Sequence, residues 1–256
     1  MPWLHVLVIA LLCGPVPVFL KKKHNVTDHG IYTYPFSTRL QVPMTSGALN
    51  DKMDQNVTYC SSNYRVGQVD HEGPKTYMKL YMDGTGCTSA YGASKVQLLV
   101  IVEMLSDHTA HFKIIDSNDA NRWEVPEWIF ERPAQPEMTT KRLMDVFVSD
   151  KDQPFSIDLV RRSNGETIFQ TQRLVFTDRY LEVSTFLPRN AYVYGLGERM
   201  TSLRLKPDTY TLWNTPVSPN LKGRNSYGSH PFYTEVRNGL AHGVVCHRSI
   251  PESARR

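Results

Sequence analysis

The chain has 256 residues, of which 41% are hydrophobic and 21% are charged, and its formal net charge is +4. This composition is that of an ordinary globular protein and excludes an intrinsically disordered chain. Part of the mild positive charge comes from residues 21–23, and elsewhere acidic and basic residues are interleaved, which excludes an extended nucleic-acid-binding surface. At this length we expect one domain behind a leader, although two small domains would also fit.

The chain begins with an apolar run from Leu4 to Leu12 that only His5 interrupts. The run is too short, and too rich in proline after it, for a membrane span. It resembles the apolar part of a secretory signal, although no positive residue precedes it and three lysines follow it. We predict a leader at residues 1–24, either a signal peptide or a signal anchor, and expect membrane association through this leader only. A leader produced by an imperfect gene model is the alternative.

Glycosylation sequons begin at Asn25 and Asn56, and together with the leader they favour the secretory pathway or an extracellular location. Two of the four cysteines, Cys60 and Cys87, are candidates for a disulfide that would stabilise the fold by about 3–4 kcal/mol. Two unpaired thiols are the alternative. The cysteine spacings do not fit a zinc site, and we expect no metal and no cofactor.

Residues 25–75 are rich in Thr, Ser, Asn and Gly, and they predict loops with one short strand. From residue 76 the pattern becomes typical of short strands separated by turns. The run 96–104 is nearly all apolar, which predicts a strand buried on both faces, and residues 111–116 return as its antiparallel partner. Asn164-Gly165 is a strong hairpin signal between two further strands. The strands that we expect are residues 77–82, 96–104, 111–116, 155–159, 166–170, 174–176 and 180–187.

These elements predict an all-β fold, an antiparallel β-sandwich with an irregular N-terminal region. Prolines at 126, 133, 136 and 154 exclude long regular structure in the middle of the chain, and no segment has the sustained periodicity of a long helix. We expect four segments: the leader at 1–24, the irregular region at 25–75, the sandwich at 76–245 and a tail at 246–256 without a core-forming pattern.

Residues 190–214 combine two glycines with aromatic and charged residues. Residues 192–194 favour an extended backbone, and Gly195 and Gly197 then permit a tight turn. A second strand at residues 209–213 is expected to bring Trp213 and Asn214 to a loop tip. Aromatic and amide side chains at such a tip suit a sugar, although a glycine-rich turn in a β core is the alternative.

Hydrolysis of a glycoside uses two carboxyl groups on opposite sides of the bond. Most candidates lie in turns or on strand faces, where solvated surface carboxylates are typical. We expect Glu198, which follows the glycine turn, to cap backbone amides or to pair with Arg199. The sequence has no serine-hydrolase elbow and no phosphate loop, and we expect the pair His108 and His111 to lie at a strand edge. The carboxylate candidates are Asp116, Asp119, Glu124, Glu127, Glu182 and Glu198.

A succession of motifs between Tyr77 and Val245 resembles the N-terminal domain of glycoside hydrolase family 31, most closely that of α-glucosidases (maltases). The motifs are Arg122-Trp123-Glu124-Val125-Pro126, residues 174–185, Tyr192-Val193-Tyr194-Gly195-Leu196-Gly197-Glu198-Arg199, residues 205–214 and Tyr227-Gly228-Ser229-His230-Pro231-Phe232-Tyr233.

The resemblance implies a galactose-mutarotase-like sandwich that packs against a catalytic (β/α)₈ barrel. It also implies a retaining α-glycosidase whose two catalytic aspartates lie on that barrel, downstream of these residues. We therefore expect a fragment of a glycoside hydrolase that has no catalytic residues of its own and is inactive alone. A free-standing carbohydrate-binding or protein-interaction module is the alternative.

The substrate-binding residues that the resemblance implies are Trp213, Asn214 and Thr215, and the expected ligand is an α-glucoside oligosaccharide, weakly bound. Relatives carry an aspartate shortly after the Trp-Asn pair, where this chain has Pro216. We therefore expect one hydrogen bond to the sugar to be missing.

Overall fold

The computed structural model of the chain describes residues 4–11, 25–26, 31–34, 63–89, 92–119, 139, 141–171, 173–178, 181–188, 191–208, 210, 212 and 222–248. These residues form strands, turns and loops, and no helix occurs among them. None of the described segments is therefore a helix with the length and apolarity needed to cross a membrane. The all-β prediction is confirmed.

The strands differ in length from two to ten residues. In chain order they are β1 (Leu4–Leu11), β2 (Asn25–Val26), β3 (Ile31–Tyr34), β4 (Tyr64–Glu72), β5 (Lys75–Met82), β6 (Thr88–Ser89), β7 (Gly92–Ala93), β8 (Gln97–Ser106), β9 (Thr109–Asp116), β10 (Met144–Ser149), β11 (Ile157–Arg161), β12 (Thr167–Gln170), β13 (Arg173–Phe176), β14 (Leu181–Ser184), β15 (Tyr192–Gly195), β16 (Phe232–Arg237) and β17 (Leu240–Arg248).

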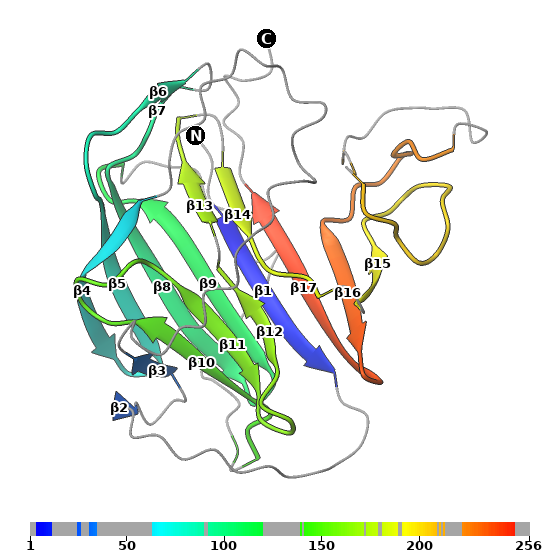
Figure 1. Ribbon diagram of the computed structural model, residues 1–256, viewed down its shortest axis with the longest axis horizontal. Coiled ribbons are helices and arrows are strands. Elements are labelled where there is room, and N and C mark those ends of the chain that lie inside the picture. Colours follow the sequence, from blue (N-terminus) through cyan, green and yellow to red (C-terminus); the bar gives the residue numbers. More distant parts are fainter. Residues whose placement is uncertain are drawn as a thin grey trace.

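Two sheets lie face to face, as a β-sandwich requires (Figure 1). The larger sheet has the order β15-β16-β17-β1-β9-β8-β5-β4, and the smaller one has the order β12-β11-β10-β3-β2. Two short pairs, β13-β14 and β6-β7, complete the described strands. All of these pairings are antiparallel except that of β3 with β10, which is parallel. The predicted antiparallel β-sandwich is confirmed.

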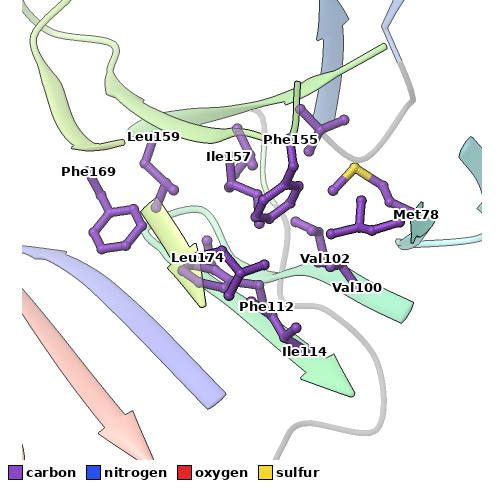
Figure 2. Close-up of a cluster of buried hydrophobic side chains, with 14 of the residues drawn as sticks. Met78, Val100, Val102, Phe112, Ile114, Phe155, Ile157, Leu159, Phe169 and Leu174 are labelled. Carbon is purple, nitrogen blue, oxygen red and sulfur yellow. The ribbon is translucent and has the colours of Figure 1, made fainter. Parts of the chain in front are cut away.

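The core lies between the two sheets, where apolar side chains from both inner faces meet (Figure 2). The larger sheet contributes alternate residues of β5, β8 and β9, and the smaller sheet contributes alternate residues of β10 and β11 together with Ile168 and Phe169 of β12. Leu98, Val100 and Val102 of β8 are fully buried, whereas Leu99 and Ile101 on its other face are half-buried. The prediction that this strand is buried on both faces is therefore only partly right.

The predicted hairpins are present. β8 and β9 pair antiparallel around the turn at Asp107 and His108. β11 and β12 pair around the Asn164-Gly165 turn, where Gly165 has a φ of 69°. A positive φ is a conformation that glycine adopts without steric cost, which explains the strength of this hairpin signal.

The apolar run for which we predicted a leader forms β1, which lies between β9 and β17 in the larger sheet (Figure 1). The leader at residues 1–24 stays a prediction, as do the four segment boundaries. Within the region expected to be irregular, the structure has β2, β3 and the nine-residue β4. Sequence analysis therefore missed most of the regular structure of that region.

The first residues of the segment predicted as a tail belong to a strand. β17 continues through Arg248, and Cys246 packs against the hydrophobic core. Residues 249–256 lie outside the described residues. Cys87 is disulfide-bonded, and its predicted partner Cys60 also lies outside them. Cys246 is a free thiol.

Candidate functional site

The glycine-containing stretch forms an edge of the larger sheet. β15 is the outermost strand and pairs antiparallel with β16. At its end Gly195 has a φ of 111°, and a Cβ atom there would lie 2.5 Å from the Phe232 carbonyl oxygen. Glycine is therefore required at this position both for its dihedral and for the close approach of β16. Gly197 meets no such contact, and the other positive φ of the turn, 52°, falls on Leu196.

Gly195→Ala is therefore expected to lower the free energy of unfolding by about 1–3 kcal/mol, because it combines a left-handed backbone with a steric overlap. Gly197→Ala is the matched control, since a Cβ at that position has no neighbour within 4 Å. Urea unfolding of both variants measures the difference. Equal stability of the two variants would contradict the structure of this turn.

Two loop segments, residues 195–208 and 222–231, lie side by side after the turn, and we call them together the lip. Their backbones are joined by hydrogen bonds, among them those from the Glu198 N–H to the Gly228 oxygen at 2.9 Å and from the His230 N–H to the Gly197 oxygen at 2.8 Å. Asn225 is buried, and its amide donates to the Gly228 carbonyl oxygen at 3.1 Å. These bonds give the lip a defined backbone although it contains little regular structure.

Glu198 has a structural role in the lip. Its carboxylate accepts a hydrogen bond from the Gly228 N–H at 3.2 Å, so the predicted capping of backbone amides is confirmed. Its side chain also lies 3.6 Å from Nε2 of His230, and both side chains are more than half exposed. Arg199 donates from Nε to the Leu196 carbonyl oxygen at 2.7 Å, which ties it to the turn.

Aromatic and apolar side chains are exposed on the lip and on residues next to it. The guanidinium of Arg204 lies 3.8 Å from the centre of the Tyr192 ring. Tyr210 is fixed through its hydroxyl group, which donates to the Lys206 carbonyl oxygen at 2.8 Å. Tyr227 is 67% exposed, so its ring is available for contact with another molecule. Flat aromatic faces beside polar groups are suited to stacking on a ligand.

The predicted substrate-binding residues Trp213, Asn214 and Thr215 lie outside the described residues, as does Pro216. Of the strand expected at residues 209–213, the described residues are Tyr210 and Leu212, and neither belongs to a strand. The predicted loop tip therefore stays a prediction.

Two of the described carboxylate candidates, Asp116 and Glu182, form ion pairs on other strands. Asp116 on β9 is buried and lies 3.3 Å from Lys95, and Glu182 on β14 lies 3.2 Å from Arg173. Residues 124 and 127 lie outside the described residues. His111 is buried on β9 and lies 2.8 Å from Glu103, so it is not at an exposed edge. Within the described part of the chain, no group of three metal-ligating side chains comes together.

A buried charged cluster lies on β16 and β17, beside the edge strand that leads into the lip, and it was not predicted from the sequence. Glu235 on β16 is opposite Val193 of β15 and is fully buried. Both of its oxygens accept hydrogen bonds from Arg237, one of them at 2.9 Å from Nη2, and His242 of β17 lies 3.2 Å away. Arg237 also donates to the Thr167 carbonyl oxygen of β12 at 2.9 Å. The cluster therefore links the lip-bearing end of the larger sheet to the smaller sheet.

The charges of this cluster make stability depend on pH. Burial alone raises the pKa of the Glu235 carboxyl, but the neighbouring His242 and Arg237 outweigh burial and leave the pKa below its ordinary value. A lowered folded-state pKa contributes stability that is present above the ordinary glutamate pKa of about 4.3 and is lost as the pH falls through the folded-state value.

We therefore expect the natural chain to lose stability below about pH 4 more steeply than the Glu235→Gln variant, which has no carboxyl to protonate at this position. Urea unfolding at a series of acidic pH values measures the two slopes. Parallel slopes would show that Glu235 has the same pKa in the folded and unfolded chains.

In chemical terms the lip offers stacking surfaces and hydrogen-bonding groups. The carboxylate of Glu198 already accepts a hydrogen bond from the Gly228 N–H and lies 3.6 Å from Nε2 of His230. Glycoside hydrolysis needs two carboxyl groups free to act on the bond, roughly 5–10 Å apart. The described geometry therefore assigns Glu198 to the structure of the lip.

Comparison with known proteins agrees with this geometry. Residues 99–251, more than half of the chain, match the model of the glycosyl hydrolase 31 N-terminal galactose mutarotase-like domain. A probable alpha-glucosidase of Oryza sativa subsp. japonica is 35% identical over 71% of this chain and 23% of its own length. An alpha-glucosidase of Hordeum vulgare is 38% identical over 63% and 20%, and alpha-xylosidase 1 of Arabidopsis thaliana is 32% identical over 75% and 23%.

The chain thus spans about a fifth of the length of these curated relatives. The matched residues include most of the hairpin of β8 and β9, the lip and the hairpin of β16 and β17. The chain belongs to the family of glycosyl hydrolase 31 N-terminal galactose mutarotase-like domains.

Proposed function

We propose that this chain is the accessory β-sandwich of a retaining α-glucosidase, an enzyme that hydrolyses terminal α-glucosides, and that the 256 residues alone are inactive. The observation that carries the proposal is the family match over residues 99–251. Two of the relatives described above are named as alpha-glucosidases. In this proposal the lip forms one wall of the substrate cleft, with Trp213, Asn214 and Thr215 at its tip, and the catalytic carboxylates come from a barrel.

A covalent label tests the inactivity of the chain. A cyclitol epoxide of α-gluco configuration forms an ester with the nucleophile of a retaining α-glucosidase, because the carboxylate opens the strained ring. We expect the intact mass of the 256-residue chain to stay unchanged after incubation, while a purified α-glucosidase used as positive control gains one label. Stoichiometric labelling of the chain would contradict the proposal and would identify the carboxylate that reacted.

The exposed aromatic surface of the lip favours a second candidate, a carbohydrate-binding module that acts without an attached barrel. Tyr227 is its most exposed aromatic side chain, and Glu198 and His230 lie in the same lip. Calorimetry with maltose and glucose at millimolar concentrations tests this candidate, with Tyr227→Ala as the binding variant and Tyr81→Ala, on β5, as control. No heat with either sugar would exclude it.

We also propose that the protein enters the secretory pathway. The disulfide at Cys87 supports this location, because structural disulfides persist in oxidising compartments. The sequons at Asn25 and Asn56 point in the same direction. A shift in mass on treatment with a glycosidase that removes N-linked glycans, measured on protein from eukaryotic cells, tests the proposal.

A further inference from the structure

β1 holds its place in the larger sheet by backbone pairing. It is antiparallel to β9 over residues 4–9 and antiparallel to β17 over residues 4–11. No turn joins it to either neighbour, whereas β8 and β9, and likewise β16 and β17, are joined by short turns. The interaction that fixes β1 is therefore of the kind that two separate chains can also make.

The position of β1 is central to the sheet. In the described strand order it is the one strand that connects β15-β16-β17 with β9-β8-β5-β4 (Figure 1). Without it, β9 and β17 would each present an unpaired row of N–H and C=O groups, which is a template for another strand. The side chains of Phe112 and Ile114 on β9, and of Val244 on β17, are buried in the core beside this position. The position therefore fits an extended, apolar segment.

We propose that the position between β9 and β17 is a strand-acceptor site whose partner is a second copy of this chain, each copy inserting its residues 4–11 into the other. The segment that pairs along both edges is present in every copy that retains residues 4–11. Exchange preserves each backbone pair of β1, so the closed monomer and the exchanged dimer differ little in their interactions. The concentration of the chain then decides between the two forms. This inference is independent of the proposed glucosidase function.

The natural cysteine of β17 provides a specific test. Val6 lies directly opposite Cys246 in the register of β1 and β17, and Cys246 is a free thiol. Opposite residues of antiparallel strands have Cα atoms about 4.5–5.5 Å apart, which is within the range of a disulfide. The experiment mixes a tagged 256-residue chain carrying Val6→Cys and Cys246→Ala with the untagged natural chain. Only strand exchange brings the two thiols together.

We expect a covalent heterodimer after mixing at high micromolar concentration with an oxidation catalyst. Pairing of the strands raises the effective concentration of the two thiols. We therefore expect the yield of heterodimer to exceed that of a tagged Val96→Cys, Cys246→Ala control by about tenfold or more. Val96 is 48% exposed and is not opposite Cys246. Light scattering of the unsubstituted chain is expected to show a dimer whose share rises with concentration.

A second variant separates failure of exchange from failure to fold. The single variant Val6→Cys retains Cys246 and is expected to close an intramolecular disulfide at low concentration, seen as a mass loss of two hydrogens. Closure within one chain, together with heterodimer yields at the control level, would show a fixed β1 and would overturn the proposal. A folded variant that forms neither disulfide would overturn it as well, because residues 4–11 would not occupy the site.

Discussion

Glu235→Ala is expected to lower the free energy of unfolding by about 3–5 kcal/mol, because it leaves the guanidinium of Arg237 buried without its carboxylate. This is a large part of the total stability of a domain, which is about 5–15 kcal/mol. The carboxylate accepts two hydrogen bonds from Arg237 and also lies against His242. Removing one partner of such a buried pair costs more than the pair itself contributes.

Two further variants show whether the unpaired charge causes the loss. Glu198→Ala removes a carboxylate that is 53% exposed, and we expect a loss of less than about 1 kcal/mol. The double variant Glu235→Met, Arg237→Met removes both charges and is expected to lose less stability than Glu235→Ala alone. Urea unfolding gives all three values. A double variant less stable than Glu235→Ala would show that the hydrogen bond from Arg237 to β12 matters more than the buried charge.

Phe112→Ala is expected to lower the free energy of unfolding by about 3–5 kcal/mol, because the ring fills the space between the two sheets. Phe112 on β9 is 1% exposed, and its ring centre lies 5.4 Å from that of Phe169 on β12. Figure 2 shows side chains from both sheets near it, such as Ile114 and Ile157, together with Leu174 of the β13-β14 pair. The cavity would therefore open at the contact between the two layers.

The matched control is Phe186→Ala, since Phe186 is 52% exposed and its removal opens no cavity. We expect this variant to stay within about 0.5 kcal/mol of the natural chain. Chemical unfolding with an unchanged m-value measures both changes. Equal stability of the two variants would contradict the packing of β9 against β12.

Short-range signals allowed much of the fold to be predicted. The alternation in β5 and β11, the apolar run of β8 and the Asn164-Gly165 turn each depend on neighbours in sequence, and each is present in the structure. Asn238-Gly239 carries the same turn signal with both φ values positive, 49° and 77°, and it joins β16 to β17. This hairpin was predictable by the same rule.

β4 was missed for a local reason. Tyr64 and Val66 are buried, but the register of β4 against β5 shifts between Val66 and Gln68. A β-bulge adds one residue to a strand, so the next core-facing residue is Val69 and the simple alternation ends. The sequence of β4 therefore does not have the period of two that sequence analysis requires.

The buried cluster and the place of β1 could not be predicted, because both depend on contacts between distant segments. Glu235 and Arg237 alternate with Val236 as they would on a strand with one solvent-facing side. Only the arrangement of β17 and β12 around them shows that they are buried and paired. The insertion of residues 4–11 between β9 and β17 likewise has no signal in the residues that precede or follow them.

The proposal that the 256 residues alone do not cleave an α-glucoside is tested most directly by glucose release from maltose. The measurement uses the purified 256-residue chain at several concentrations. A purified α-glucosidase is the positive control, and a sample of Phe112→Ala unfolded in urea and then diluted is the unfolded control. We predict that glucose release by the folded chain equals that of buffer at every concentration. Release that rises in proportion to the folded chain, and that persists through two successive purification steps, would contradict this account.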